Sequence, residues 1–284
     1  MPVLAILAAG SLASCPIPPD NPGFDATAYL SNAAEPEMEA MIACLGDPDP
    51  VIRDVQALGA FTAALRSGAI SKEKRMALLE QLFAAAFEPG DDGGGFMAPF
   101  AVLALAELAR TDRIEPWLEQ DVLDRFVQFG ALYLSEERDY RGFIEGEGWR
   151  HGIAHGADLM MQLSLNPRVR RLSGKVILEA VAAQVAPAEH AYVFGEPARL
   201  ARPVLILADK GLFTPEEWQR WFAMLHPPQD GEWANRHNHA VTLTQMHNLR
   251  AFALEIHEVA SRQEDSPAKD LAPLALDLIR ATEG

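Results

Sequence analysis

The sequence predicts an all-α protein, and three observations support this fold class. Apolar residues recur at helical spacing over long stretches, as at Val51, Val55 and Leu58. Glycine and proline separate these stretches, as helix ends require. Runs of alternating β-branched residues between hairpin turns do not occur in the sequence. Helices of about 12–20 residues joined by short loops favour a HEAT-like superhelix of degenerate helix pairs, with a closed α/α toroid as the alternative.

Capping patterns mark where several of these helices begin. Ser71 can cap the helix that ends near residue 87, and Thr214-Pro-Glu-Glu217 forms a capping box with proline in the first turn. The glycine-rich segment 90–95 lacks a following Lys-Ser/Thr and a preceding strand, which indicates a linker and not a phosphate-binding loop. The other helices are expected at 37–45, 51–65, 96–109, 118–134, 149–163, 174–186, 196–210, 215–225, 237–262 and 271–281.

The first 34 residues differ in character from the rest of the chain. Residues 3–12 are apolar or small, and Leu12-Ala-Ser-Cys15 then resembles the cleavage site of a bacterial lipoprotein, although no Lys or Arg precedes it. Lipidation of Cys15 would tether an extracytoplasmic protein to a membrane through a proline-rich spacer, whereas an accidental match leaves a cytoplasmic protein. With only one other cysteine, Cys44, we expect no disulfide framework. The expected organisation is a signal-like segment and tether at 1–34 and one helical domain at 35–284.

The charge of the chain limits its partners. A formal net charge of -16 argues against nucleic acid, because binding to phosphates needs a basic face. Partners of the helical domain are therefore expected to be a small molecule or another protein.

The densest group of chemically versatile residues lies between residues 137 and 161. If residues 149–163 form a helix, His151 and His155 lie one turn apart on the same face and can bind one divalent metal ion, such as zinc. Asp158 is too far along the axis to join both histidines on the ion, but it can orient the His155 ring. A third ligand would come from Glu145 or Glu147, or from a histidine at 237, 239 or 247. The alternative is that both histidines satisfy buried backbone or carboxylate groups.

The loop before this segment adds further candidates. Arg141 can form a bidentate ion pair with Asp139 or a glutamate and so stabilise the loop. Alternatively, two carboxylates around a pocket could act as acid and base in glycoside cleavage, with Trp149 as a platform for a sugar ring. The candidate ligand-binding residues are Asp139, Arg141, Glu147, Trp149 and Asp158.

Two segments of this region resemble a known family. Asp139-Tyr-Arg-Gly-Phe143 and Gly148-Trp-Arg-His-Gly-Ile-Ala-His-Gly-Ala-Asp158-Leu are similar to the hallmark of the bacterial DUF2785 family. The flanking elements Ile52-Arg-Asp54, Ser71-Lys-Glu and Glu196-Pro-Ala-Arg199-Leu-Ala extend the resemblance over residues 49–222. It implies an α-helical repeat fold and a site at these positions, but no reaction. This chain has Ala98-Pro99 where an arginine-serine pair is common in the family.

Three functions are compatible with these patterns. The first is a helical-repeat protein whose polar pocket around His151, His155 and Asp158 binds a small ligand or a metal. The second is a metal-dependent hydrolase that uses the two histidines, with Glu147 as general base. The third is a scaffold that binds another protein.

Overall fold

The computed structural model describes residues 14–17, 23–90, 94–228 and 231–283. Within this part of the chain the protein is all-α, with one pair of two-residue strands. None of the described helices is both long and apolar enough to cross a membrane. The elements are α1 (Ala26–Asn32), α2 (Glu35–Ala43), η1 (Cys44–Gly46), η2 (Val51–Leu58), α3 (Gly59–Ser67), α4 (Lys72–Phe87), α5 (Met97–Ile114), α6 (Gln120–Glu136), β1 (Phe143–Ile144), β2 (Gly148–Trp149), α7 (Gly152–Leu165), α8 (Arg171–Gln184), α9 (Glu196–Asp209), α10 (Pro215–Leu225), η3 (Gly231–Asn238), α11 (Ala240–Ser261), η4 (Pro267–Asp270) and α12 (Leu271–Ala281).

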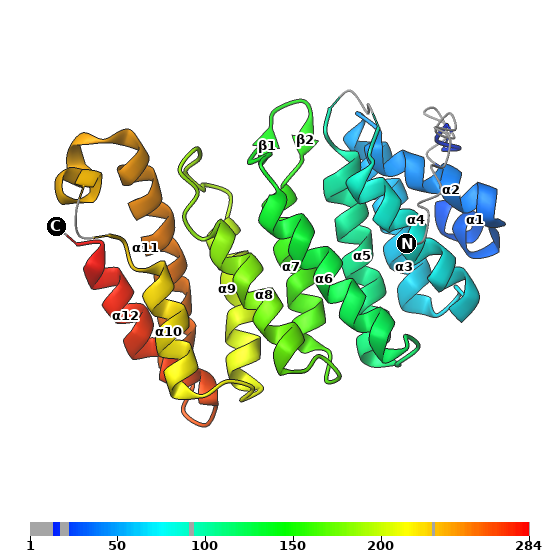
Figure 1. Cartoon of the computed structure of the whole chain (residues 1–284). Coiled ribbons are helices and arrows are strands. Elements are labelled where there is room, and N and C mark those ends of the chain that lie inside the picture. Colours follow the sequence, from blue (N-terminus) through cyan, green and yellow to red (C-terminus); the bar gives the residue numbers. More distant parts are fainter. Residues whose placement is uncertain (1–13, 18–22, 91–93, 229–230, 284) are drawn as a thin grey trace, which may run out of the picture.

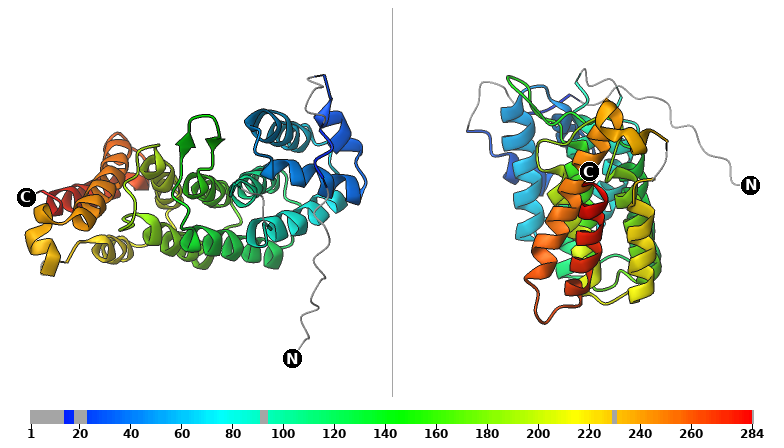
Figure 2. Two further views of the ribbon diagram at one scale, coloured as in Figure 1. Left: turned by 90° about the horizontal axis from the view of Figure 1, so that it is seen from above. Right: turned by 90° about the vertical axis from the view of Figure 1, so that its left-hand side faces the viewer.

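The helices stack in two layers. In one layer α5 packs on α7, α7 on α9 and α9 on α11. In the other layer α4 packs on α6 and α6 on α8, and each of these three helices also packs on its partner in the first layer (Figure 1). Helices α1 and α12 lie at opposite ends, so the array is open and the toroid alternative does not apply (Figure 2). The all-α class is confirmed, and the HEAT-like superhelix stays a prediction.

Local capping chemistry explains why several helices begin where the sequence predicts. The Ser71 hydroxyl accepts a hydrogen bond from Lys74 N at 3.4 Å at the start of α4. At the start of α10, Thr214 Oγ1 accepts from Glu217 N and the Glu217 carboxylate accepts from Thr214 N, which is the expected capping box. These bonds satisfy backbone groups that a helix leaves unpaired at its first turn.

Helix α5 runs five residues beyond its predicted end at residue 109. The first two residues of the segment that suggested a break, Thr111 and Asp112, are buried, and Asp112 accepts hydrogen bonds from residues that follow the helix. Its Oδ1 accepts from Trp117 N and Leu118 N at 2.8 Å, and its Oδ2 accepts from Asn166 and Arg168. A buried carboxylate with this many hydrogen-bond donors is stabilised. The helix can therefore continue through the polar residue Asp112.

The folded part begins before residue 35, inside the range assigned to a tether. Helix α1 is capped by Asp25, whose Oδ1 accepts from Ala28 N at 2.8 Å, and Leu30 on this helix is buried. The helix packs on α3 and α2. The predicted apolar stretch 3–12 lies outside the described residues.

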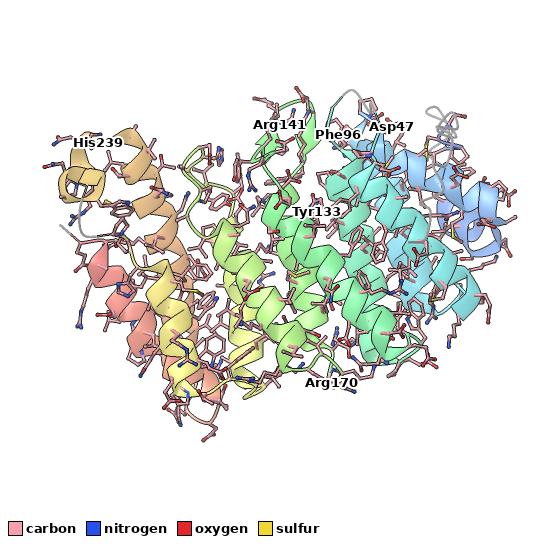
Figure 3. All side chains as sticks on the ribbon, viewed as in Figure 1. Asp47, Phe96, Tyr133, Arg141, Arg170 and His239 are labelled. Carbon is pink, nitrogen blue, oxygen red and sulfur yellow. A yellow bond between two sulfur atoms is a disulfide. The ribbon has the colours of Figure 1, made fainter. Side chains whose placement is uncertain are left out.

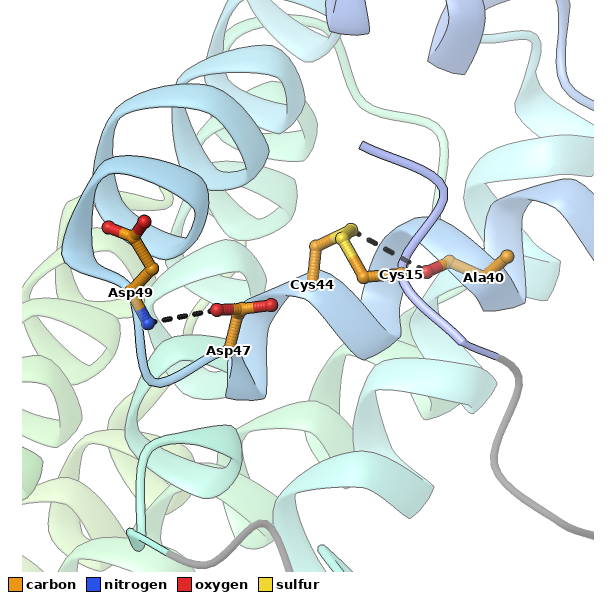
Figure 4. The surroundings of a disulfide bond; sticks show 5 residues. All are labelled: Cys15, Ala40, Cys44, Asp47 and Asp49. Atoms are coloured by element: carbon orange, nitrogen blue, oxygen red, sulfur yellow. Dashed lines mark hydrogen bonds between the residues drawn. A yellow bond between two sulfur atoms is a disulfide. The ribbon is translucent and has the colours of Figure 1, made fainter. Parts of the chain in front are cut away.

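The two cysteines form a disulfide, contrary to the expectation that no disulfide framework holds this fold. Cys15 is bonded to Cys44 at the end of α2, with their Cα atoms 4.7 Å apart (Figure 4). Ile17 beside it is buried against the core. A sulfur in a disulfide cannot also carry a thioether-linked lipid. The disulfide and the predicted lipidation of Cys15 therefore exclude each other.

We predict that breaking this bond lowers the free energy of unfolding by about 2–4 kcal/mol, because it closes a loop in the unfolded chain. Chemical denaturation of the parent and of Cys44→Ser measures the difference, and Cys15→Ser should match Cys44→Ser. Thiol titration of the unfolded parent should find no free thiol before reduction. Palmitate label on the parent but not on Cys15→Ser would contradict the disulfide and assign the sulfur to lipid.

Candidate functional site

A short hairpin at one edge of the array holds the candidate site. Strands β1 and β2 pair antiparallel, with Phe143 opposite Trp149. Gly146 in the turn and Gly148 at the start of β2 have φ of 85° and 83°, a conformation that glycine adopts at little cost. Figure 3 shows Arg141 at this edge together with Phe96, while Arg170 lies at the opposite edge.

His151 links the hairpin to α7 in a strained conformation. Its φ of 59° and ψ of 35° are left-handed, and it is the one described non-glycine residue with positive φ. Helix α7 therefore begins at Gly152, and the prediction that the helix begins at residue 149 is wrong. The cause is tertiary: His151 N donates to Arg141 O at 3.0 Å, which extends the hairpin pairing up to the first residue of the helix.

The His151 ring lies between an aromatic side chain and a carboxylate. It stacks on Trp149 with the ring centroids 4.7 Å apart. Its Nε2 lies 3.5 Å from Glu196 Oε1 but makes no hydrogen bond, although the ring is largely buried. An unsatisfied buried polar atom costs stability, so this nitrogen marks the position as a candidate functional site.

Glu196 at the start of α9 is almost fully buried and was not among the predicted site residues. Burial by itself raises the pKa of this carboxyl, but the adjacent His151 ring and the backbone N–H groups of Glu196 and Phe194 outweigh burial and lower the pKa. One of these bonds runs from Phe194 N to Glu196 Oε2 at 2.9 Å. The carboxylate is therefore ionised next to His151. No sequence pattern connects the two residues, which are 45 positions apart.

His155 is buried one turn into α7, next to His151 but turned to another partner. Its Nδ1 lies 3.1 Å from Pro99 O. Because a carbonyl only accepts, this contact assigns the proton of the neutral ring to Nδ1 and leaves Nε2 as an acceptor. Burial, followed by the nearby His151, lowers the pKa of His155 from its usual 6.5 to about 3. The ring is therefore neutral at physiological pH.

Asp158 does not orient His155, and that prediction is wrong. Its carboxylate pairs with Arg199 of α9, and Arg202 lies 3.8 Å away on the same helix. Burial raises the pKa of Asp158, and the two guanidinium groups oppose that effect. The neighbouring helix supplies stronger partners than the imidazole does, because an arginine donates to a carboxylate with both charge and geometry.

The metal interpretation lacks a ligand set. Within the described residues, no three His, Cys, Asp or Glu side chains lie where they could hold one ion. Of the proposed third ligands, Glu147 pairs with Arg150, and His247 Nε2 contacts Tyr192 O at 3.1 Å. Figure 3 places His239 over the C-terminal end of the array, away from the hairpin.

The predicted pair of Asp139 and Arg141 is confirmed. Arg141 Nε donates to Asp139 Oδ1 at 2.8 Å, and Arg141 Nη2 donates to Gly94 O at 3.1 Å. The glycine-rich segment, which was expected to be a plain linker, thus accepts a hydrogen bond from Arg141 beside the hairpin. Glu147, the candidate base, has a half-exposed side chain engaged with Arg150.

Two arginines that sequence reasoning missed hold the hairpin in place. The guanidinium carbons of Arg53 and Arg150 lie 3.9 and 4.2 Å from the centroid of the Phe96 ring. Arg53 is fully buried and donates to Glu147 O at 3.1 Å. Arg150 Nε donates to Gly94 O at 2.6 Å. These contacts join segments distant in sequence, so only the fold brings them together.

The site opens to solvent at an aromatic rim. Trp149 is 36% exposed, and its ring centroid lies 5.2 Å from that of Phe143 and 5.6 Å from that of Phe194. Of the predicted site residues, the fold brings the rings of Trp149, His151 and His155 together at the start of α7, and Asp158 lies further along that helix. Asp139, Arg141 and Glu147 instead stabilise the hairpin.

The strain at His151 gives a first prediction. Glycine tolerates a left-handed backbone, whereas alanine does not, so His151→Gly should be more stable than His151→Ala by roughly 1 kcal/mol. Both variants lose the imidazole equally. Urea denaturation compares them directly. Equal stability, or a more stable alanine variant, would mean that the backbone at this position is not left-handed.

The depressed pKa of His155 gives a second prediction. As pH falls below 6.5 the unfolded chain binds a proton at this residue while the native state does not, so stability is lost toward the native pKa of about 3. The loss is at most about 1.4 kcal/mol per pH unit. Unfolding free energies measured between pH 7 and pH 5 should fall less steeply in His155→Gln, which keeps a donor for Pro99 O. Parallel curves would show that His155 is protonated in the native state.

Comparison with known proteins agrees with the resemblance seen in the sequence. The family model described as "Protein of unknown function (DUF2785)" matches residues 82–257, more than half of the chain and including the whole of α7. No curated protein matches the chain. No solved structure matches it either. The chain belongs to the DUF2785 family.

Proposed function

We propose that this protein binds a small polar ligand that contains a ring, such as a sugar, at the aromatic rim beside His151. The single observation that carries the proposal is the state of His151. A left-handed non-glycine backbone and an unsatisfied buried nitrogen each cost stability, and they occur in one residue. Such features persist where the surrounding structure enforces them, often at functional sites.

The surroundings of His151 supply what a ring-bearing ligand needs. Trp149 and Phe194 offer partly exposed aromatic surface, on which the apolar face of a sugar can pack. His151 Nε2 next to the ionised Glu196 offers a polar contact that fixes orientation. The side chain of Arg199 is 36% exposed although it pairs with Asp158, so it can donate outward as well.

Location outside the cytoplasm is part of the proposal. The disulfide between Cys15 and Cys44 supports it, because such bonds persist in oxidising compartments and are rare in the cytosol. The apolar residues 3–12, which resemble a signal segment, favour the same side of the membrane whether or not Cys15 carries lipid. Recovery of the parent protein only from the cytoplasmic fraction, with both thiols reduced, would refute this location.

The binding proposal is tested with methyl glycosides of the common hexoses and a panel of disaccharides, in thermal-shift and titration assays. We expect at least one of these probes to bind the parent, and Trp149→Ala and His151→Ala to weaken that binding by about tenfold. Trp233→Ala, a tryptophan change in η3, is the matched control and should bind normally. The proposal fails if no probe binds, or if the Trp149 and His151 variants bind as the parent does.

A further inference from the structure

A second hollow lies in the other layer of the array, away from the hairpin. It has a volume of about 400 Å³ and lies between α8 and α10. The two helices are joined across it by two polar contacts, a hydrogen bond from Trp221 Nε1 to Leu178 O at 3.1 Å and an ion pair between Arg171 and Glu217. The volume is in the range of small-molecule sites in proteins.

The floor and one wall of this groove are apolar. Trp221 and Leu178 are buried at its base, and Phe213 lies beside them. Leu172 and Met224 stand at its mouth with 78% and 65% of their surfaces exposed. Large apolar side chains this exposed, next to a hollow, mark a surface that can bury apolar groups of a ligand.

The rim of the groove carries a small excess of basic residues, in contrast to the acidic protein as a whole. Arg171, Lys175 and Arg220 line it together with two acidic residues, Glu179 and Glu217, whereas the whole chain has a net charge of -16. Lys175 is only weakly paired, with Nζ 3.8 Å from Glu179 Oε1 on the exposed surface. Arg220 makes no hydrogen bond or ion pair with any residue that the structure describes, although its charge acts on Glu216 and Glu217 of the same helix.

We propose that this groove binds a small amphipathic carboxylate, an acyl chain or aromatic ring that carries one anionic group. The apolar part would lie over Trp221 and Phe213, where its burial supplies the driving force. The carboxylate would accept hydrogen bonds from Arg220 and Lys175, two cationic side chains of an otherwise acidic protein. This site is independent of the His151 site and of the function proposed there.

The test uses three probes with the same twelve-carbon chain: dodecanoate, dodecanol and dodecyltrimethylammonium, each below its micellar concentration. Calorimetric titration of the whole protein should show saturable binding of dodecanoate, with dodecanol at least about tenfold weaker and the cationic probe weaker still. Equal binding of all three would overturn the proposal, because the rim would then not recognise an anion.

Two variants localise the binding. Arg220→Glu combined with Lys175→Glu should weaken dodecanoate by about tenfold or more, and Met224→Ser should weaken dodecanoate and dodecanol alike. Arg280→Glu, a single charge reversal at an exposed position of α12, should leave both affinities unchanged. Circular dichroism confirms that each variant is folded. Normal dodecanoate binding by the double variant would refute the site. The site would also be refuted if the parent formed a dimer that dissociates on the Met224→Ser substitution but not on addition of dodecanoate, because the groove would then be a dimer interface.

Discussion

The buried guanidinium of Arg53 is the contact on which the candidate site depends. It donates to the carbonyls of Asp47 and Glu147 and to the carboxylate of Asp54, and it lies over the Phe96 ring. Burying a charged group is costly unless its donors are satisfied. Because those acceptors belong to the N-terminal helices and to the hairpin, satisfying Arg53 attaches the hairpin to the array.

The attached hairpin in turn determines the conformation of His151. The chain passes from the hairpin pairing into α7 within one residue, His151. The left-handed backbone of His151 makes this sharp change of direction possible. The two helices on either side of α7, α5 and α9, then supply one partner each. Pro99 O lies against His155, and Glu196 lies against His151. The polar groups of the site are thus positioned by a packed layer of helices and not by a free loop.

The same stacking leaves two unlike surfaces. The edge that carries the hairpin presents aromatic rings beside an imidazole and a buried carboxylate, which suits a ligand with a polar ring. The groove between α8 and α10 presents an apolar floor with a basic rim, which suits an amphipathic anion. The first surface results from strain at one residue, and the second from the incomplete packing of two neighbouring helices.

The sequence by itself determined the all-α class, most helix positions and the segment that holds the site. Helical periodicity and caps such as Ser71 and Thr214 act between neighbours in the chain, so they can be read locally. The ion pair of Asp139 with Arg141 is local for the same reason. Only the tertiary structure decided that α7 begins at Gly152, that Asp158 pairs with Arg199 and that Cys15 bonds to Cys44. The start of α7 depends on the hairpin pairing before it. The other two depend on partners far along the chain, which the packing of the helices brings within reach.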